Sequence, residues 1–397
     1  MSTADPVTPP ERSMPAAADA AGPVRLKVIP AAARAEALFL WRKLELQLGN
    51  RRLMCSSLWT EVWLNHFGQL IPHQFAVGMR AGAVCGIALL TQGVRQCAGP
   101  IPLATWHIGT AGEPEADSVC VEYNALLAGP GDQCEFAAVL FEWAREQTNC
   151  DEFRLDGFES QSIRTLLQNC PAAQVDRKIS YYFDLRLCRE NNEEPLAKLG
   201  THTRANIRRT LRDFGDVQSE WAETPARAEQ LFAELVKLHQ ARWTSAGKPG
   251  AYASRLFYDF HLELLWRAVP LGLTTIVGLS AGNRLIGCSH LLIDNHRGLF
   301  YQCGWTPGGG RTSTGLALDY LCISECLRRG YDEVDFLAGN TEHKRRLSTN
   351  QAELAWAVWR RSSLKNAAIG TMRRLKKSAV KLRKSMSLTK QNPDSAK

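Results

Sequence analysis

The chain has 397 residues, which is enough for two or more domains of the usual size. Its apolar content, 45%, is ordinary for a protein with a folded core, and no apolar run approaches the roughly 18 residues that a membrane-spanning helix needs. The formal net charge is +8, yet residues 365–390 alone carry nine basic residues and no acidic one. The rest of the chain is therefore close to neutral, which does not favour a body that binds nucleic acid.

The composition of the N-terminus and the spacing of the cysteines indicate the cellular compartment in which the protein is expected. Residues 1–23 are rich in proline, alanine and serine and lack the apolar segment of a signal peptide. We therefore expect this segment to be disordered and the protein to be cytoplasmic. The twelve cysteines form no CxxC pair. In a reducing cytoplasm this spacing predicts thiols rather than disulfides or a metal site.

Helical and alternating patterns of apolar residues predict that helices and strands are mixed along the first half of the chain. Ala81-Gly82 joins two of the strands into a predicted hairpin. The expected elements, in chain order, are a strand at 24–29, a helix at 31–47, a helix ending near 67, two strands within 75–91, a strand at 103–109, a helix around 136–143, a strand at 153–155, a short helix at 163–167 and a strand at 181–187.

The second half repeats the order hairpin, strand, helix, strand. Val77–Gly82 matches Val277–Gly282 at an offset of 200 residues, and residues 151–157 resemble residues 332–339. The repetition predicts an internal duplication of one α/β unit. The expected elements of this half are helices at 207–214, 225–243, 254–268 and 316–327, and strands at 273–279, 284–294, 298–304 and 331–337.

A glycine-rich loop at 308–315 leads into the helix at 316–327. A loop that opens onto a helix N-terminus offers unpaired backbone N–H groups and the positive end of the helix dipole, which suit a phosphate. A polar cluster follows the next strand and is expected to act on whatever that phosphate carries. The residues proposed to hold the phosphate are Arg311, Ser313, Thr314 and Gly315, and the polar cluster includes Asp335, Asn340, Lys344 and Arg345.

The run AGNTEHKRR, with GLALDYLCISECLRRGYDEVDFLAGN leading into it, resembles the CelD-type (cellulose-biosynthesis) acetyltransferases of the GNAT superfamily. Upstream, LGTHTRANIRRTLRDFG resembles the basic entry helix of that family, and LVKLHQARWTSAGKPG resembles its helix that ends in Arg-Trp. The duplication resembles tandem GNAT proteins, which include the Fem-type aminoacyl transferases of peptidoglycan synthesis. The resemblance implies an α/β fold of two tandem GNAT-like units, with mixed sheets flanked by helices. The expected parts are a disordered segment at 1–23, units at 24–190 and 191–360, and a basic tail at 361–397.

The resemblance also implies an activity. It implies that an acetyl or other acyl group moves from acyl-CoA to an amine or hydroxyl of a sugar or cell-envelope precursor, such as an exopolysaccharide, without a metal. Lys344 matches the lysine that lies at the reacting carbonyl in Fem-type enzymes, so it is expected to stabilise the oxyanion or to bind an acidic acceptor. GNAT proteins usually hold the pyrophosphate on a Q/R-x-x-G-x-G/A loop, and residues 311–317 match that loop with one extra residue after the arginine.

Acyl transfer also needs a group that takes a proton from the acceptor. Asp335 lies between apolar neighbours in its strand, so its carboxylate serves either as a base in the cleft or on the polar face of the sheet. His290 is a base if it faces the cleft and a core histidine if it does not, and Tyr301 is a candidate acid. The residues expected to bind the acceptor are Arg204, Arg208, Trp243, Asn340 and Arg345.

Several alternatives stay open at this stage. Lys344 is also compatible with a solvated surface lysine, Trp243 with a core residue, the arginines near 204–212 with a solvated helix face, and the glycine loop with an ordinary helix cap. The protein as a whole is compatible with a Fem-like transferase that uses aminoacyl-tRNA, or with a non-catalytic assembly factor in polysaccharide synthesis. The basic tail predicts attachment to the inner face of an anionic membrane, although RNA binding or a disordered tail fits the same composition.

Overall fold

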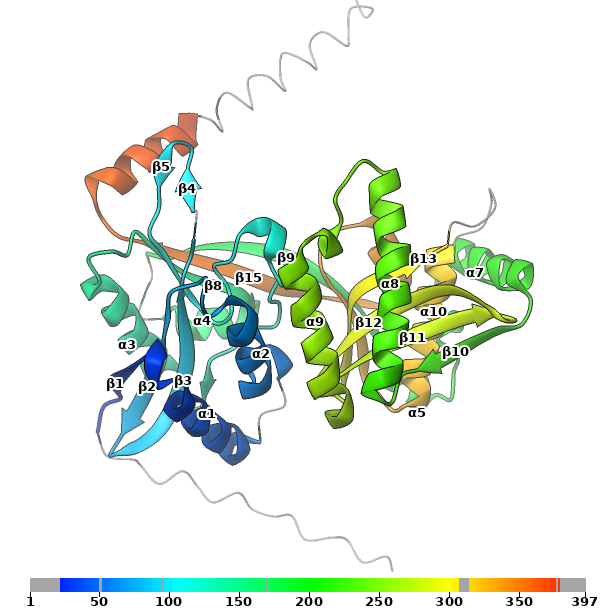
Figure 1. Cartoon of the computed structure of the whole chain (residues 1–397), viewed down its shortest axis with the longest axis horizontal. Coiled ribbons are helices and arrows are strands. Elements are labelled where there is room, and N and C mark those ends of the chain that lie inside the picture. Colours follow the sequence, from blue (N-terminus) through cyan, green and yellow to red (C-terminus); the bar gives the residue numbers. More distant parts are fainter. Residues whose placement is uncertain are drawn as a thin grey trace, which may run out of the picture.

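The computed structural model is a mixed α/β protein in which most strands join one 13-stranded sheet (Figure 1). The order of the strands across the sheet is β1-β2-β3-β6-β8-β15-β9-β14-β13-β12-β11-β10, and β7 pairs with β3 beside this path. The structure describes residues 22–49, 52–94, 96–168, 170, 172–306, 314–375 and 378.

Ten elements of the first unit recur in the same order in the second unit, so the expected tandem fold is confirmed. The first unit contains β1 (Arg25–Pro30), α1 (Arg34–Leu48), α2 (Ser57–Phe67), β2 (His73–Arg80), β3 (Ala83–Gln92), β6 (Thr105–Ile108), α3 (Gln133–Glu146), β8 (Glu152–Glu159), α4 (Ser160–Leu166) and β9 (Gln174–Asp184). The second unit contains β10 (Val217–Trp221), α8 (Pro225–Ser245), α9 (Arg255–Ala268), β11 (Thr274–Ala281), β12 (Arg284–Asp294), β13 (Arg297–Trp305), α10 (Thr314–Arg328), β14 (Glu333–Ala338), α11 (Glu342–Leu347) and β15 (Asn350–Arg360).

The remaining elements are short or connect the two units. They are β4 (Cys97–Ala98), β5 (Ile101–Pro102), β7 (Leu127–Ala128), α5 (Arg186–Glu190), α6 (Pro195–Lys198) and α7 (Thr201–Phe214). A further helical segment at 364–375 begins the basic tail.

The two units exchange their last strands. Strand β9 ends the first unit in sequence but pairs with β14 of the second, and β15 ends the second unit but pairs with β8 of the first. The two exchanged strands also pair with each other in antiparallel orientation, from Asn350 opposite Tyr182 to Val358 opposite Gln174. They lie across the centre of the molecule and join the two halves into one sheet (Figure 1).

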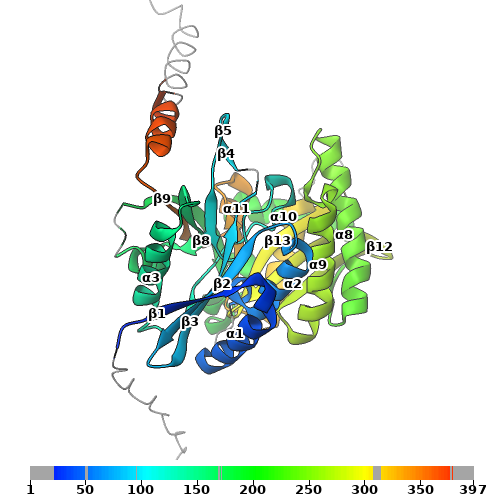
Figure 2. The same ribbon diagram turned by 60° about the vertical axis from the view of Figure 1, so that its left-hand side comes forward.

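Helices cover both faces of this sheet. Helices α1, α2, α8 and α9 share one apolar core that extends across both units. The opposite face carries two separate cores, one under α3 and α4 and the other under α10. The view in Figure 2 shows α1, α2, α8 and α9 grouped on the same side of the strands.

Local sequence explains several helix ends. The Ser56 and Ser254 side chains accept hydrogen bonds from the backbone N–H groups of Trp59 and Phe257 and so cap α2 and α9. Thr224 caps α8 in the same way, and Pro225 occupies the first turn of that helix, where proline is tolerated.

The predicted strand at 181–187 is wrong in its second half. β9 ends at Asp184, and residues from Arg186 onward form α5. The Asp184 carboxylate accepts a hydrogen bond from the Arg186 backbone N–H at 3.0 Å, which stabilises the start of the helix. The longer strands β10 and β15 and the two-residue strands β4, β5 and β7 were not among the expected elements. Within the described part of the chain, no helix combines the length and apolar character needed to cross a membrane.

Candidate functional site

Two parallel strands part in the middle of the second unit. β13 and β14 pair only between Arg297–Leu299 and Glu333–Asp335, and the rest of β13 has no partner in β14. β14 then leaves regular strand geometry at Leu337, a buried residue with φ 62°. A left-handed conformation at a branched residue is uncommon, and residues with strained backbone cluster at functional sites.

Asp335 is buried at the point where β13 and β14 part, rather than on an exposed face of the sheet. It is 1% exposed and accepts hydrogen bonds from Tyr123 Oη at 2.5 Å, Ser180 Oγ at 2.7 Å and the Leu337 backbone N–H at 2.6 Å. Burial raises the pKa of Asp335, although these hydrogen bonds oppose the shift. Because all three partners come from different segments, Asp335 fixes the end of β14 against the first unit and against β9.

Lys344 lies at the same strand end. Its Nζ atom donates hydrogen bonds to the carbonyl oxygens of Leu337 and Ala338, each at 2.9 Å. Thr341 caps the short helix α11 and so sets the direction from which the lysine returns to the strand. A side chain at Gly339 would begin 3.2 Å from Nζ. Burial lowers the pKa of Lys344, and the nearby carboxylates of Glu122 and Asp335 oppose that shift.

The start of α10 faces the parted strands. Thr314 and Gly315 are both buried, and a Cβ atom at position 315 would lie 3.0 Å from the ring of Trp305. The Arg242 guanidinium lies 4.1 Å from the centre of the Trp305 ring. The Thr314 hydroxyl has no hydrogen-bond partner among the described residues. Arg311 and Ser313, which were also expected to hold the donor, lie outside the described residues.

Asp319 and His343 connect α10 to α11. The distance between Asp319 Oδ2 and His343 Nε2 is 2.6 Å. Burial lowers the pKa of His343, but the hydrogen bond and the charge of Asp319 outweigh burial and raise it overall. Sequence reasoning overlooked Asp319, although a carboxylate next to the apolar stripe of a helix is an unusual residue that deserves a functional explanation.

A cavity of about 340 Å³ lies where the loop at 110–122 meets the exchanged strands. The loop packs on the α9 side of the sheet, because Tyr301 Oη donates to the Val119 carbonyl at 2.5 Å. Glu122 lines the cavity, and its Oε2 atom accepts a hydrogen bond from the Ala338 backbone N–H at 2.6 Å. One carboxylate therefore reaches both the cavity and the strand end to which Lys344 is hydrogen-bonded. The cavity is lined by Gln96, His107, Thr110, Ala111, Gly112, Glu113, Glu115, Ser118, Cys120, Val121, Glu122, Asp156, Lys178 and Trp356.

Four other predicted residues form no hydrogen bond with Asp335 or Lys344. His290 is fully buried and 2.9 Å from Thr274 Oγ1, and burial lowers its pKa to about 3, which fits the core alternative. Tyr301 is also buried, and burial raises its pKa far above the ordinary value. Arg204 donates to the Ala197 carbonyl at 3.3 Å near the start of α7. Arg208 is exposed on the same helix.

Three expected acceptor-binding residues lie closer to the junction. Asn340 Oδ1 accepts a hydrogen bond from Tyr181 Oη at 3.1 Å, just beyond β14. Arg345 is exposed and pairs with Glu342 at 2.6 Å. Trp243 lies beside Arg242, 5.6 Å from its guanidinium to the ring centre, and its indole N–H has no partner among the described residues.

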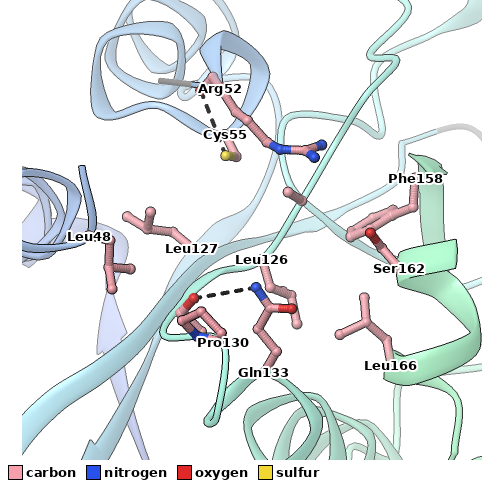
Figure 3. A pocket seen from close by; sticks show the side chains of 12 residues that line it. Leu48, Arg52, Cys55, Leu126, Leu127, Pro130, Gln133, Phe158, Ser162 and Leu166 are labelled. Atoms are coloured by element: carbon pink, nitrogen blue, oxygen red, sulfur yellow. Dashed lines mark hydrogen bonds between the residues drawn. The ribbon is translucent and has the colours of Figure 1, made fainter. Parts of the chain in front are cut away.

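A second pocket, of about 190 Å³, lies at the start of α3 in the first unit (Figure 3). By the order of elements, α3 corresponds to α10 of the second unit. Leu127, Phe158 and Leu166 give this pocket an apolar wall, and the Gln133 amide donates to the Ala128 carbonyl at 3.4 Å. The Arg52 guanidinium pairs with Glu159 at 2.6 Å.

Comparison with known proteins places part of the chain in a described family. Residues 201–345 match the family described as the Acetyltransferase (GNAT) domain. The second unit has the GNAT fold. No curated protein sequence matches the chain.

Three solved structures cover most of the chain at low sequence identity, and such likeness shows the fold alone. A conserved protein of unknown function from Bacteroides thetaiotaomicron is 13% identical, with a TM-score of 0.51 over 85% of this chain and 100% of its own. FemX is 12% identical, with a TM-score of 0.50 over 81% of this chain and 95% of its own. The C-terminal domain of a lysylphosphatidylglycerol synthetase from Agrobacterium fabrum is 10% identical, with a TM-score of 0.51 over 85% of this chain and 96% of its own.

Proposed function

We propose that the protein transfers an acetyl or other acyl group from acyl-CoA to an amine or hydroxyl of a sugar or cell-envelope precursor, as CelD-type enzymes do. The observation that carries the donor half of this proposal is the parting of β13 and β14 beside the start of α10. Backbone amide and carbonyl groups of β13 that have no partner in β14 are suited to the amide groups of a pantetheine chain.

The start of α10 supplies the site for the phosphates of the donor. Thr314 brings a buried hydroxyl without a partner among the described residues, and Gly315 lets the Trp305 ring pack directly against the start of the helix, since a Cβ atom there would lie 3.0 Å from the ring. The N-terminal N–H groups of a 15-residue helix favour an anion. The Arg242 guanidinium, stacked on Trp305, adds a positive charge nearby.

In this proposal Lys344 stabilises the negative charge that develops on the carbonyl oxygen during acyl transfer. An ammonium group has three N–H donors. Two of them bond to the carbonyls of Leu337 and Ala338, and the third bonds to none of the described residues. A cation held rigidly by two hydrogen bonds, with one donor left over, is the preorganised arrangement that stabilises a developing oxyanion.

The basic tail supports attachment of the protein to the inner face of the membrane. In the helical segment at 364–375, Leu364 is 92% exposed and Leu375 is 65% exposed, and Arg374 is exposed beside them. Lys365 and Arg373 pair with Asp151 and Glu152 at 2.5 and 3.1 Å, so the segment begins firmly on the first unit. An exposed apolar and basic surface of this kind binds anionic membranes.

Thermal unfolding with and without acetyl-CoA tests the donor site. A ligand at about 100 times its dissociation constant adds roughly 2.7 kcal/mol of stability, which raises the melting temperature. Gly315→Trp places a large ring where even a Cβ atom would lie 3.0 Å from Trp305, so it displaces the start of α10 and is expected to remove that increase. Lys237→Ala, at an exposed lysine on α8, is expected to keep it. The melting curve of Gly315→Trp without ligand shows whether the variant is folded.

An absence of stabilisation by any acyl-CoA in the wild-type protein refutes the proposal. In that case aminoacyl-tRNA becomes the donor to test, since FemX shares the fold. A non-catalytic assembly role would leave function intact in Lys344→Ala, whereas an acyltransferase would lose most of its turnover.

A further inference from the structure

The pocket at the start of α3 lies where the parallel strands of the first unit part. β6 and β8 pair as far as Ile108 and Leu155, and Asn124 forms one further bridge with Phe158. Beyond that bridge, residues 125–128 line one side of the pocket, and residues of β8 and α4 line the other. By the order of elements, β6, α3 and β8 correspond to β13, α10 and β14. The pocket is therefore the first unit's counterpart of the gap beside the start of α10.

The start of α3 differs from the start of α10 in charge. Glu135 lies in the first turn of α3 and Asp132 immediately precedes that helix, whereas the described first turn of α10 contains no acidic residue. Arg80 pairs with both carboxylates, at 2.8 and 3.2 Å, so one arginine balances two acids. Carboxylates at a helix N-terminus repel a phosphate and take the place that it would occupy. The acidic start of α3 therefore opposes a second acyl-CoA at this position.

Apolar side chains form most of the wall of the pocket, and Figure 3 shows them arranged around a common space. Leu126, Leu127, Phe158 and Leu166 are all buried. The other apolar lining residues are Leu48, Cys55, Ala125, Ala128 and Pro130. A cavity of about 150 Å³ that is lined by leucine, isoleucine and phenylalanine stays dry and binds benzene. By that comparison, the 190 Å³ of this pocket hold about six to eight carbon atoms.

Three polar side chains complete the lining: Arg52, Gln133 and Ser162. The Arg52 guanidinium pairs with Glu159 at 2.6 Å, so its charge is balanced within the first unit. A ligand with a carboxylate would have to displace Glu159, and a ligand with an ammonium group would meet the guanidinium. The Ser162 hydroxyl and the Gln133 amide instead suit an uncharged oxygen, such as that of an alcohol or an ester.

We propose that this pocket binds a saturated hydrocarbon chain of about six to eight carbons whose head group is uncharged. Burial of the chain against the apolar wall supplies the affinity, and Ser162 and Gln133 contact the oxygen of the head group. The pocket belongs to the first unit and lies apart from the proposed donor site at the start of α10. The inference therefore goes beyond the proposed acyl transfer and does not depend on it.

The wall of the pocket continues into a segment that contacts the second unit. Ala125 lies two residues after Tyr123, whose hydroxyl donates to Asp335 at 2.5 Å. It lies three residues after Glu122, which accepts from the Ala338 backbone N–H at 2.6 Å. A hydrocarbon chain packed against Ala125 restricts the local opening of this segment and, through it, of the end of β14. A bound chain is therefore expected to slow amide hydrogen exchange in residues 121–128 and in residues 336–338.

Calorimetry of the full-length protein with 1-butanol, 1-hexanol, 1-octanol and 1-decanol tests the proposal. Each added methylene is expected to tighten binding about fourfold until the pocket is full, at about six to eight carbons, and longer chains are expected to gain nothing. Hexanoate and hexylamine have the same chain as 1-hexanol with a charged head group, and both are expected to bind at least about tenfold more weakly. Octyl glucoside has the chain of 1-octanol on a large head group. Equal binding of these two compounds assigns the pocket to the chain of an amphiphile, and binding of 1-octanol alone assigns it to a free small molecule.

Two variants change the size of the pocket in opposite directions. Ala125→Leu adds three carbons to the wall and is expected to move the best chain length down by about three carbons. Leu166→Ala removes three carbons and is expected to move the best chain length up by about three. Ala35→Leu is the matched control, because Ala35 is exposed on α1, and its binding curve is expected to equal that of the wild type. Opposite shifts cannot result from partial unfolding, and melting curves show that each variant is folded.

Several results would overturn the proposal. They are the absence of binding by every alcohol, affinity that rises with chain length without a break, and the same best chain length in wild type, Ala125→Leu and Leu166→Ala. Hexanoate or hexylamine that binds as tightly as 1-hexanol overturns the uncharged head group. Unchanged hydrogen exchange in residues 336–338 with 1-hexanol bound overturns the link to the second unit. Stabilisation by acetyl-CoA is measured separately, so the proposed function stands or falls independently of these results.

Discussion

Glu152 allows a stability prediction whose size follows from its surroundings. The side chain is completely buried at the first residue of β8 and forms ion pairs with Arg154 at 2.6 Å, Arg360 at 2.9 Å and Arg373 at 3.1 Å. These arginines come from β8, β15 and the tail. Burial alone would raise the pKa of Glu152, but the hydrogen bonds and charges of Arg154 and Arg360 outweigh it and lower the pKa from 4.5 to about 2.

The shift has a direct consequence for stability. Each pKa unit corresponds to about 1.4 kcal/mol, so the ionised Glu152 contributes about 3 kcal/mol to folding at neutral pH. Because the folded pKa lies below the unfolded one, this contribution is complete above the unfolded pKa and is lost as pH falls toward about 2. At pH ~3 about 2 of the ~3 kcal/mol should already be lost. Glu152→Gln is therefore expected to cost about 3 kcal/mol at pH ~7 and much less at pH ~3.

Urea unfolding followed by circular dichroism at several pH values measures this difference. The matched control is Glu36→Gln, because Glu36 and Lys27 form an exposed pair, and such pairs contribute less than about 1 kcal/mol. A cost for Glu152→Gln below about 1 kcal/mol at neutral pH, or a cost that does not change with pH, would refute the reasoning.

Three further predictions concern the proposed site and the tail. Lys344→Ala is expected to lower kcat by about 10²- to 10³-fold while acetyl-CoA still raises the melting temperature, and loss of both would indicate that the lysine mainly supports the fold. Asp319→Asn is expected to lower the melting temperature at pH values below the unfolded pKa of His343, where the ring is protonated and Asp319 stabilises it. The effect on the melting temperature is expected to shrink as pH rises through the raised folded pKa, and a pH-independent effect would contradict this. Leu375→Glu is expected to reduce sedimentation with vesicles that contain anionic lipid, with an unchanged melting temperature, and equal sedimentation by wild type and variant would argue against a membrane role.

Local patterns in the sequence predicted most of the helices and hairpins. The hairpin at Ala81-Gly82 and its repeat at Ala281-Gly282 could be predicted because each turn contains a glycine. In the structure these glycines have positive φ, 82° and 54°, which glycine adopts readily. The strand end at Asp335, Lys344 and the start of α10 were also located by sequence order, since they follow one another within about thirty residues.

Contacts between distant segments could not be predicted in the same way. β15 pairs with β8, about 200 residues earlier in the chain, and no local periodicity indicates such a partner. Glu122 and Tyr123 reach Ala338 and Asp335 from an irregular loop of the first unit, so their presence at the site depends on the packing of the two units. His107 was assigned to a strand, but its pairing with Asp156 depends on two strands that only the fold brings together.

The exchange of β9 and β15 has a consequence for how the protein can be divided. A fragment that ends after β9 would carry the closing strand of its neighbour and lack its own, and it would expose the edge of β8, which invites aggregation. The second unit expressed alone would expose the edge of β14 in the same way. Two fragments cut near residue 191 and produced together should instead reassemble, because each supplies the strand that the other needs. The intact chain is accordingly expected to melt in a single transition, so that any ligand held by one unit protects both.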